Sequence, residues 1–403
     1  MEVARVSSRN GKRMTTSAAN AEADQRDSLD SSEVCTLLMT EIGNMGGAER
    51  SCMALANWLS AHRVPRRFVL YRDTYGVGIH TNQPLDVVQL SPGRGARNKI
   101  AALRQFLRAH PTERCAPLLS GYQIALHATL AGARRFTTLM HDTPSLFGQG
   151  LIRTSREKLR EHVSNAVVGY GLRRAEKLGG HTIVTSEYLK DECRRVFGVE
   201  ARIVRMGGLP LSAPFQIRPV RDTLRLLSVQ RVEANKRIDW ILTSLAELEQ
   251  DAVPLSSRVD WRLDVAGTGS ALEMLRKMSA DLGLAHRVCF HGFVSDEHLQ
   301  ELYYQAHLFL MPARQGYGIP AIEALQRGIP ILLSRESGVS DILLNTHWAT
   351  VFTGDAKQMT SKFREAVDNV ISGKHHAEPP PSLPTEESWA EEVAYLCGWT
   401  RGQ

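Results

Sequence analysis

Residues 308–340 read LFLMPARQGYGIPAIEALQRGIPILLSRESGVS, and this stretch decides the fold. The apolar run 308–311 stops at a proline, as a buried strand does. Two glycines in 316–318 form a loop, and Pro320 then opens an apolar segment of helical period, where its missing N–H breaks no helical hydrogen bond. A second apolar run follows at 331–333. The stretch predicts strand, glycine loop, helix and parallel strand, with a helix N-terminus that suits an anion.

The same residues carry a family resemblance. The segment QGYGIPAIEA at 315–324 resembles the nucleotide-sugar site of GT4-type glycosyltransferases of the GT-B fold, whose pattern is roughly EGFGLPxxEA. The resemblance implies that Glu323 takes both hydroxyls of a ribose. It also implies that the backbone amides of Gly316, Tyr317 and Gly318 hold the sugar and the distal phosphate. From the sequence alone, Glu323 could also be a half-exposed helix glutamate.

Gln315 departs from that pattern, because the family has a glutamate there, near the transferred sugar. An amide can hydrogen-bond a hydroxyl, but it carries no charge to offset an oxocarbenium-like centre. The sequence therefore leaves two outcomes open at Gln315, either altered chemistry or specificity, or lost activity.

The composition bounds the class of protein. The chain has 403 residues, an apolar content of 43% and a charged fraction of 23%, which are typical of a globular protein with two domains. The formal charge of +6 is compatible with an anionic membrane surface or a phosphorylated substrate. No apolar run approaches the roughly 20 residues that span a bilayer. Residues 1–32 are polar and predict a disordered tail rather than a signal peptide.

Cysteine usage indicates a reducing compartment. The six cysteines are scattered singly, mostly in apolar segments, which predicts buried thiols in the cytoplasm and neither disulfides nor a zinc site. They are Cys35, Cys52, Cys115, Cys193, Cys289 and Cys397.

Strands and helices alternate twice along the chain, which predicts two Rossmann-like domains, each with a parallel sheet covered on both faces. We expect an N-terminal acceptor domain at 33–208, a proline-containing linker at 209–222 and a C-terminal nucleotide-sugar-binding domain at 223–378. The resemblance implies that a last helix, within 386–400, returns to the first domain. The predicted strands are 34–40, 68–71, 87–90, 117–120, 136–140, 182–185, 224–229, 263–266, 288–290, 308–311, 331–333 and 350–352. The predicted helices, besides the one opened by Pro320, are 48–59, 100–107, 151–178, 187–196, 238–248, 272–282, 299–305, 358–371 and 389–396.

Two further loops supply candidate phosphate ligands. Arg231 and Lys236 follow the strand 224–229 and could clamp a diphosphate. Spacing alone favours solvated loop cations, but the segment is similar to the family's GRLxxxKG, which favours phosphate contact.

Gly46 and Gly47 follow the first strand and let a phosphate or sugar approach the next helix. An ordinary tight turn is equally compatible with the spacing, and the string GGAER resembles the family's first-domain loop.

His141 ends the strand 136–140, in TTLMHDTPS. A lone histidine is more often structural. The carboxyl end of a parallel strand faces the ligand in open α/β sheets, and the family places a polar residue there against the donor sugar. We therefore assign His141 and Gln315 to the catalytic set. Asp142 could orient His141 or cap the next segment.

One helical region is strongly basic. It could dock on an anionic membrane at the inner face of the cell membrane, or it could be a solvated helix face, which the sequence favours slightly. Its cations are Arg153, Arg156, Lys158, Arg160, Arg173, Arg174 and Lys177.

The sequence thus predicts a cytoplasmic glycosyltransferase that moves a sugar from a nucleotide-diphosphate sugar to an acceptor hydroxyl, in polysaccharide or glycolipid assembly. The resemblance implies retention by front-face attack. No D-x-D string is present, so we expect no metal at the donor. We also expect no cofactor and no nucleic-acid partner. One alternative is a catalytically weakened, nucleotide-sugar-binding regulatory protein. A nicotinamide-dependent oxidoreductase is a second, against which the incomplete fingerprint at Gly267, Gly269 and Leu272 argues. A sugar-nucleotide epimerase of the same fold is a third.

Overall fold

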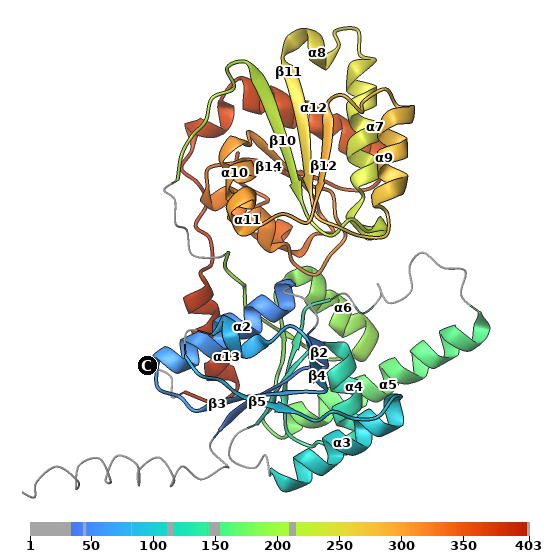
Figure 1. Cartoon of the computed structure of the whole chain (residues 1–403), viewed down its shortest axis with the longest axis vertical. Helices are drawn as coiled ribbons and strands as arrows, with labels where there is room; N and C mark the ends of the chain where they lie inside the picture. Colours follow the sequence, from blue (N-terminus) through green and yellow to red (C-terminus); the bar gives the residue numbers. More distant parts are fainter. Residues whose placement is uncertain are drawn as a thin grey trace, which may run out of the picture.

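The computed structural model describes residues 34–42, 46–81, 83–110, 116–142, 144, 154–208 and 215–400. The predicted tail at 1–32 lies outside these residues. Two parallel sheets form two separate bodies, one above the other in Figure 1. This is the predicted α/β architecture of two Rossmann-like domains.

The N-terminal sheet has seven strands in the order β5-β3-β1-β6-β7-β8-β9, and every pairing is parallel. Its central strand β6 reads LLS, and β7 is buried along its whole length, as a strand covered on both faces must be. The bounds are β1 Cys35–Leu38, β3 Arg66–Leu70, β5 Asp86–Gln89, β6 Leu118–Ser120, β7 Thr137–Met140, β8 Thr182–Val184 and β9 Arg202–Ile203. A short pair, β2 Glu41–Ile42 and β4 Arg72–Asp73, lies beside it.

The C-terminal sheet has six strands in the order β12-β11-β10-β13-β14-β15, again all parallel. The strands β13 and β14, which flank the decisive glycine loop, are buried throughout. The bounds are β10 Thr223–Val229, β11 Asp260–Ala266, β12 Val288–Gly292, β13 Leu308–Met311, β14 Ile331–Ser334 and β15 Ala349–Phe352.

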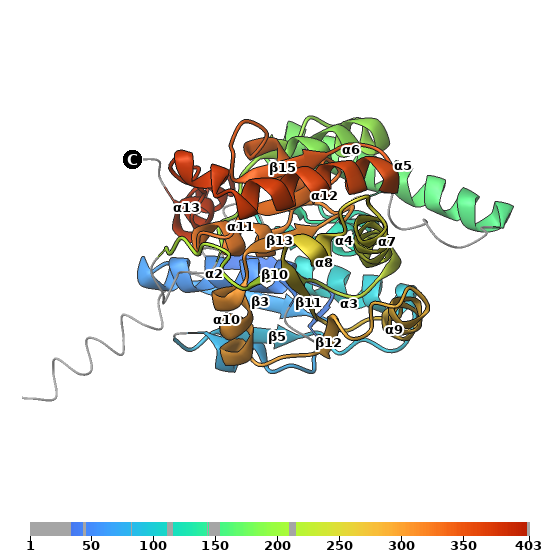
Figure 2. The ribbon, with the colours of Figure 1, turned by 90° about the horizontal axis from the view of Figure 1, so that it is seen from above.

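Helices cover both sheets, as Figures 1 and 2 show. In the first domain they are α2 Gly47–Ala61, α3 Ala96–Ala109, α4 Tyr122–Ala131, α5 Ser155–Lys177 and α6 Glu187–Phe197. In the second they are α7 Ile238–Glu249, α8 Leu255–Arg258, α9 Leu272–Asp281, α10 Asp296–Gln305, α11 Ile319–Gln326 and α12 Ala356–Ile371, and α13 Glu386–Leu396 comes last. Short 3₁₀ turns are η2 Val77–His80, η4 Ala234–Lys236, η5 Gly338–Ile342 and η6 Lys374–Ala377.

The last helix lies against the first domain rather than the second. α13 packs beside α2 (Figure 1), and its Trp389 and Val393 are buried in the core cluster that also holds Leu55 of α2. The indole Nε1 of Trp399 donates to the carbonyl of Ala116 at 3.1 Å, which fixes the end of the chain on this domain. The linker predicted at 209–222 is described only from residue 215 onward, so its extent stays a prediction.

The prediction of buried cysteines is correct for four residues and wrong for one. Cys289 is exposed, because it lies on β12, the outer strand of the second sheet. Cys115 lies outside the described residues. The buried thiols are Cys35, Cys52, Cys193 and Cys397.

Among the described residues, no helix combines the length and apolar character needed to cross a bilayer. The basic region predicted at 151–178 is the helix α5, described from Ser155, which projects from the body of the first domain in Figures 1 and 2. Arg153 lies outside the described residues. Leu159 and Val163, on the first half of α5, are 64% and 53% exposed.

Candidate active site

The carboxyl ends of strands from both sheets meet between the domains. From the first sheet, β7 leads into His141 and β8 into Ser186; from the second, β10 leads into Arg231 and β13 into Gln315. In open parallel sheets, this end of the strands is where ligands bind.

The glycine loop touches the first domain directly. A Cβ at Gly316 would lie 2.1 Å from the backbone oxygen of His141, so only glycine allows this approach. The hydroxyl of Ser186 donates to the carbonyl of Gly316 at 2.8 Å. Gly318 adopts φ 140° at the start of α11, and a Cβ there would meet the side chains of Met311 and Gln315. The loop is therefore shaped by close packing as well as by backbone conformation.

Lys236 and Gln315, predicted separately, are in contact. The Lys236 ammonium donates to Oε1 of Gln315, whose Nε2 donates to the hydroxyl of Ser337 at 3.2 Å. Burial, with the nearby Arg231 charge, lowers the pKa of Lys236 to about 8, while Asp142 acts in the opposite direction. Lys236 is thus a buried cation whose partner is a neutral amide.

Arg231 is exposed, and its charge acts on both domains. It lowers the pKa of Lys236, and it opposes the rise that burial gives to the pKa of Glu49 in the first turn of α2. Asp142 contributes to that rise in Glu49. Two carboxylates of the first domain therefore face two cations of the second.

His141 lies at the end of β7, as predicted. Its Nε2 lies 3.1 Å from the hydroxyl of Ser120, at the end of the neighbouring strand β6. Burial lowers the pKa of His141, and Asp142 partly offsets this. Because burial disfavours the imidazolium, the ring is neutral near pH 7 and can donate or accept one hydrogen bond.

Glu323 is 5% exposed on α11, so it is not a half-exposed surface glutamate. Its Oε2 accepts a hydrogen bond from the hydroxyl of Tyr303 at 3.0 Å, and burial beside this carboxylate raises the pKa of Tyr303. Burial, with the Glu323 charge, also raises the pKa of Glu386 on α13 to about 7, and Arg50 opposes the shift. The carboxylate of Glu323 is therefore held by a hydrogen bond within the second domain, and its charge acts on a carboxyl group of α13.

Gly46 and Gly47 stand at the start of α2 and face the second domain. A Cβ at Gly47 would lie 3.6 Å from Cδ1 of Ile319, the first residue of α11. The N-termini of α2 and α11 therefore lie close together, each preceded by a glycine.

Further contacts hold the domains together around this site. The carboxylate of Asp341 accepts the backbone N–H of Glu187 at 2.9 Å and the guanidinium of Arg205 at 2.8 Å. It therefore caps the first turn of α6 from the other domain. The hydroxyl of Tyr317 donates to the carbonyl of Met206 at 2.8 Å, so the side chain of Tyr317 joins the domains.

Sequence reasoning did not find Ser120, Ser186, Glu49 or Asp341. Ser120 ends one strand of the first sheet and Ser186 follows another, and this position at the carboxyl end of a strand is the signal that could have found them. Glu49 is part of the quoted string GGAER. Nothing in the sequence around Asp341 indicates that it caps a helix more than 150 residues earlier.

Two Rossmann-like domains with a ligand edge between them define the GT-B class of fold. The solved structure of WaaG, a glycosyltransferase involved in lipopolysaccharide biosynthesis, aligns with 91% of this chain and 95% of its own at TM-score 0.64 and 17% identity. Anabaena Alr3699/HepE in complex with UDP and glucose aligns with 91% of this chain and 99% of its own at TM-score 0.66 and 15% identity.

The match to a sequence family is more specific than the likeness of the fold. Residues 213–378 match the glycosyl transferases group 1 family, so the chain carries a domain of that family, as the segment at 315–324 predicts. The GDP-mannose-dependent alpha-(1-6)-phosphatidylinositol monomannoside mannosyltransferase of Mycolicibacterium smegmatis is 29% identical over 168 residues, 38% of this chain and 42% of that relative. The chain thus spans less than half the length of the curated relatives it matches. The predicted family is therefore confirmed for the domain at residues 213–378.

Proposed function

We propose that this protein transfers a sugar from a nucleotide-diphosphate sugar to an acceptor hydroxyl at the edge between its two domains. The observation that carries the proposal is the contact between Lys236 and Gln315, beside Arg231 and the N-terminus of α11. A diphosphate at this edge would meet two cations and the positive end of a helix dipole, which stabilise both the bound donor and the leaving group.

The remaining roles follow from this placement. Glu323 binds the ribose hydroxyls, and the amides of Gly316, Tyr317 and Gly318 hold the sugar and the distal phosphate. A buried lysine that contacts an amide oxygen can exchange this contact for a phosphate oxygen, and the negative charge then favours its protonated form. Gly46 and Gly47 let a phosphate or the sugar of the donor approach the N-terminus of α2 at the same edge.

For the chemistry, we propose a metal-independent reaction with retention, in which the leaving phosphate takes the proton of the acceptor hydroxyl. The bond from the anomeric carbon to the phosphate oxygen breaks as the bond to the acceptor oxygen forms on the same face. His141, neutral near pH 7, donates to or accepts from a sugar hydroxyl, and Gln315 does the same without supplying charge.

UDP and glucose are bound in the Anabaena structure, and GDP-mannose is the donor in the name of the mycobacterial relative. We therefore propose that a UDP or GDP sugar is the donor here, and that a glycan or glycolipid is the acceptor. The regulatory alternative keeps the same binding edge but no turnover.

The test is release of nucleoside diphosphate from UDP, GDP and ADP sugars, measured with Mg²⁺ and with EDTA. The proposal expects release from one donor family in both conditions, reduced at least tenfold in Lys236→Met and unchanged in Lys277→Met, an exposed lysine on α9. Binding without release from any donor would favour the regulatory alternative. In that case Gln315→Glu, which restores the family's carboxylate, should create turnover, whereas in an adapted enzyme it should lower or redirect it.

Exposed apolar side chains on α5 support the predicted peripheral membrane contact, in addition to the basic charge of this helix. The exposed Leu159 and Val163 lie on the same projecting half of α5 as the exposed Arg156 and Arg160. Apolar and cationic side chains together bind an anionic bilayer surface. We propose this contact, and expect flotation with phosphatidylglycerol vesicles that is lost when both arginines are replaced by glutamine. Equal flotation of that variant would remove the contact.

A further inference from the structure

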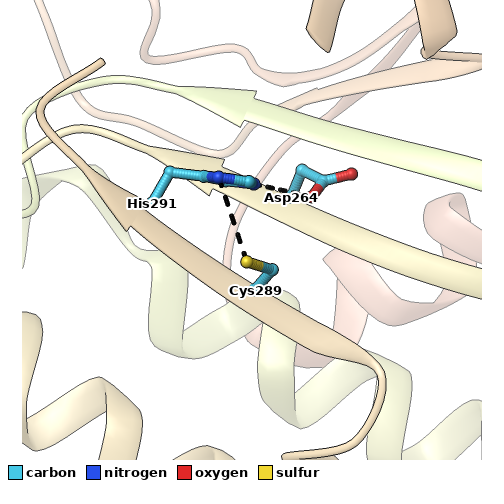
Figure 3. Close-up of side chains that lie close together, drawn as sticks. All are labelled: Asp264, Cys289 and His291. Carbon is cyan, nitrogen blue, oxygen red and sulfur yellow. Dashed lines mark hydrogen bonds and ion pairs between the residues drawn. The ribbon is translucent and has the colours of Figure 1, made fainter. Parts of the chain in front are cut away.

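A cluster of metal-ligating side chains lies on the outer strand of the second sheet, apart from the residues assigned to sugar transfer. Cys289 and His291 are two residues apart on β12, so they share one face of the strand. Asp264 on the neighbouring strand β11 is the register partner of Cys289. Figure 3 shows the imidazole of His291 between the thiol of Cys289 and the carboxylate of Asp264.

The two nitrogens of His291 face different groups. Its Nε2 lies 2.7 Å from Oδ1 of Asp264, whereas its Nδ1 lies 3.9 Å from Sγ of Cys289. The same Nδ1 lies 3.4 Å from Nε2 of His298, in the first turn of α10. His291 Nδ1 is therefore the common neighbour of a sulfur and a second imidazole.

The two separations from Nδ1 of His291 suit one small ion. Bond lengths of about 2.0–2.1 Å to imidazole and 2.3 Å to thiolate give tetrahedral ligand edges of roughly 3.3 Å between two nitrogens and 3.6 Å between nitrogen and sulfur. The observed 3.4 Å and 3.9 Å lie within a few tenths of an ångström of these values. The side chains of Cys289 and His298 reach the surface, so rotation about their χ angles would bring the sulfur and the second imidazole onto the same ion.

Each imidazole also has a carboxylate on its far side. Asp264 accepts from Nε2 of His291, and Oε2 of Glu301 lies 3.3 Å from Nδ1 of His298. Such a carboxylate fixes the tautomer that leaves the other nitrogen free for a metal and strengthens it as a ligand. The hydroxyl of Ser295, which caps α10 by accepting from the backbone N–H of His298 at 3.2 Å, holds the second imidazole in place.

We propose that Cys289, His291 and His298 bind Zn²⁺, with a water in the fourth position and with Asp264 and Glu301 as outer carboxylates. One sulfur and two imidazoles are ligands that zinc takes in proteins. The thiol proton of Cys289 leaves to solvent when the metal binds. The ion would join β12, the outer strand of its sheet, to α10, and so stabilise this edge. The spacing of the cysteines predicts no zinc site, and this proposal departs from that prediction because the other ligands are histidines.

The test uses the full chain without an affinity tag, freed of metal by a chelator. Co²⁺ is added as the probe, because a thiolate–Co²⁺ bond gives a near-ultraviolet charge-transfer band and a four-coordinate site gives strong visible bands. We expect one equivalent to saturate both signals and Zn²⁺ to displace it. Alkylation of Cys289 in the native protein, followed by peptide mass mapping, should be suppressed by stoichiometric Zn²⁺.

The variants assign the ligands. Cys289→Ser should abolish the charge-transfer band, His298→Gln should weaken Zn²⁺ at least tenfold, and Asp264→Asn should weaken it about 10- to 100-fold. His286→Gln, an exposed histidine just before β12, is the matched control and should bind as the native chain does. A Co²⁺ spectrum that Cys289→Ser leaves unchanged, or alkylation of Cys289 that Zn²⁺ leaves unchanged, would overturn the proposal. Retained donor hydrolysis in Cys289→Ser shows that this variant is folded.

Discussion

Gly316→Ala perturbs the closest contact between the domains. The new Cβ would lie 2.1 Å from the backbone oxygen of His141, and real Cβ atoms essentially never approach another heavy atom to less than 3.0 Å. The loop and the end of β7 must therefore separate by about 1 Å. Overpacking of this kind costs about 1–3 kcal/mol. The same shift weakens the 2.8 Å hydrogen bond from Ser186 to the Gly316 carbonyl, which adds about 1 kcal/mol.

The expected loss is therefore about 2–4 kcal/mol in the free energy that holds the domains together, visible as a drop of several degrees in the midpoint of thermal unfolding. Gly78→Ala is the matched control, because a Cβ there meets nothing within 4 Å. Calorimetry on both variants decides the matter. Equal midpoints for the two variants would refute the reasoning that this glycine is set by the approach of His141.

Three further predictions concern the site and its support. The pKa of Lys236 is lowered to about 8, so its positive charge is lost as the pH rises through 8. The affinity for a nucleoside diphosphate, measured by titration calorimetry, should therefore decline between pH 7 and 9.5. Lys236→Arg should remove this pH dependence. Asp341→Ala removes the ion pair with Arg205 and the cap of α6, so chemical denaturation should show a loss of about 1.5–3 kcal/mol, and an unchanged midpoint would contradict the domain contact. Trp389 is 2% exposed, so Trp389→Ala should lower the free energy of unfolding by about 3–5 kcal/mol. Tyr395 on the same helix is 55% exposed, so Tyr395→Ala should lower it little. Similar losses for both variants would argue against docking of α13 on the first domain.

The strands and helices followed from the sequence where apolar periodicity was strong. The runs around β13 and β14 are buried on both faces, so they read as continuous apolar segments in the sequence and in the structure. Four short elements, β2, β4, β9 and α8, were missed because they are too brief to show a period. The helix α4 was missed because its segment YQIALHATLA is apolar on nearly all sides and shows no polar face.

Part of the candidate site could be predicted residue by residue, but the contacts between its residues could not. Strand ends identified His141 and Arg231, since parallel strands end on one edge, and the family resemblance identified Gln315. The pairing of Lys236 with Gln315 depends on how two loops of one sheet fold over each other. The approach of Gly316 to His141 depends on the relative placement of two domains, which no local pattern contains.

The most direct measurement of the central claim is titration calorimetry of the native chain with UDP, GDP and ADP at pH 7, in EDTA. If the edge between the domains is a nucleoside diphosphate site, one of the three binds, and Lys236→Met and Glu323→Gln each weaken it at least tenfold while Lys277→Met does not. Absence of binding by all three, or equal affinity in all four proteins, would contradict the account.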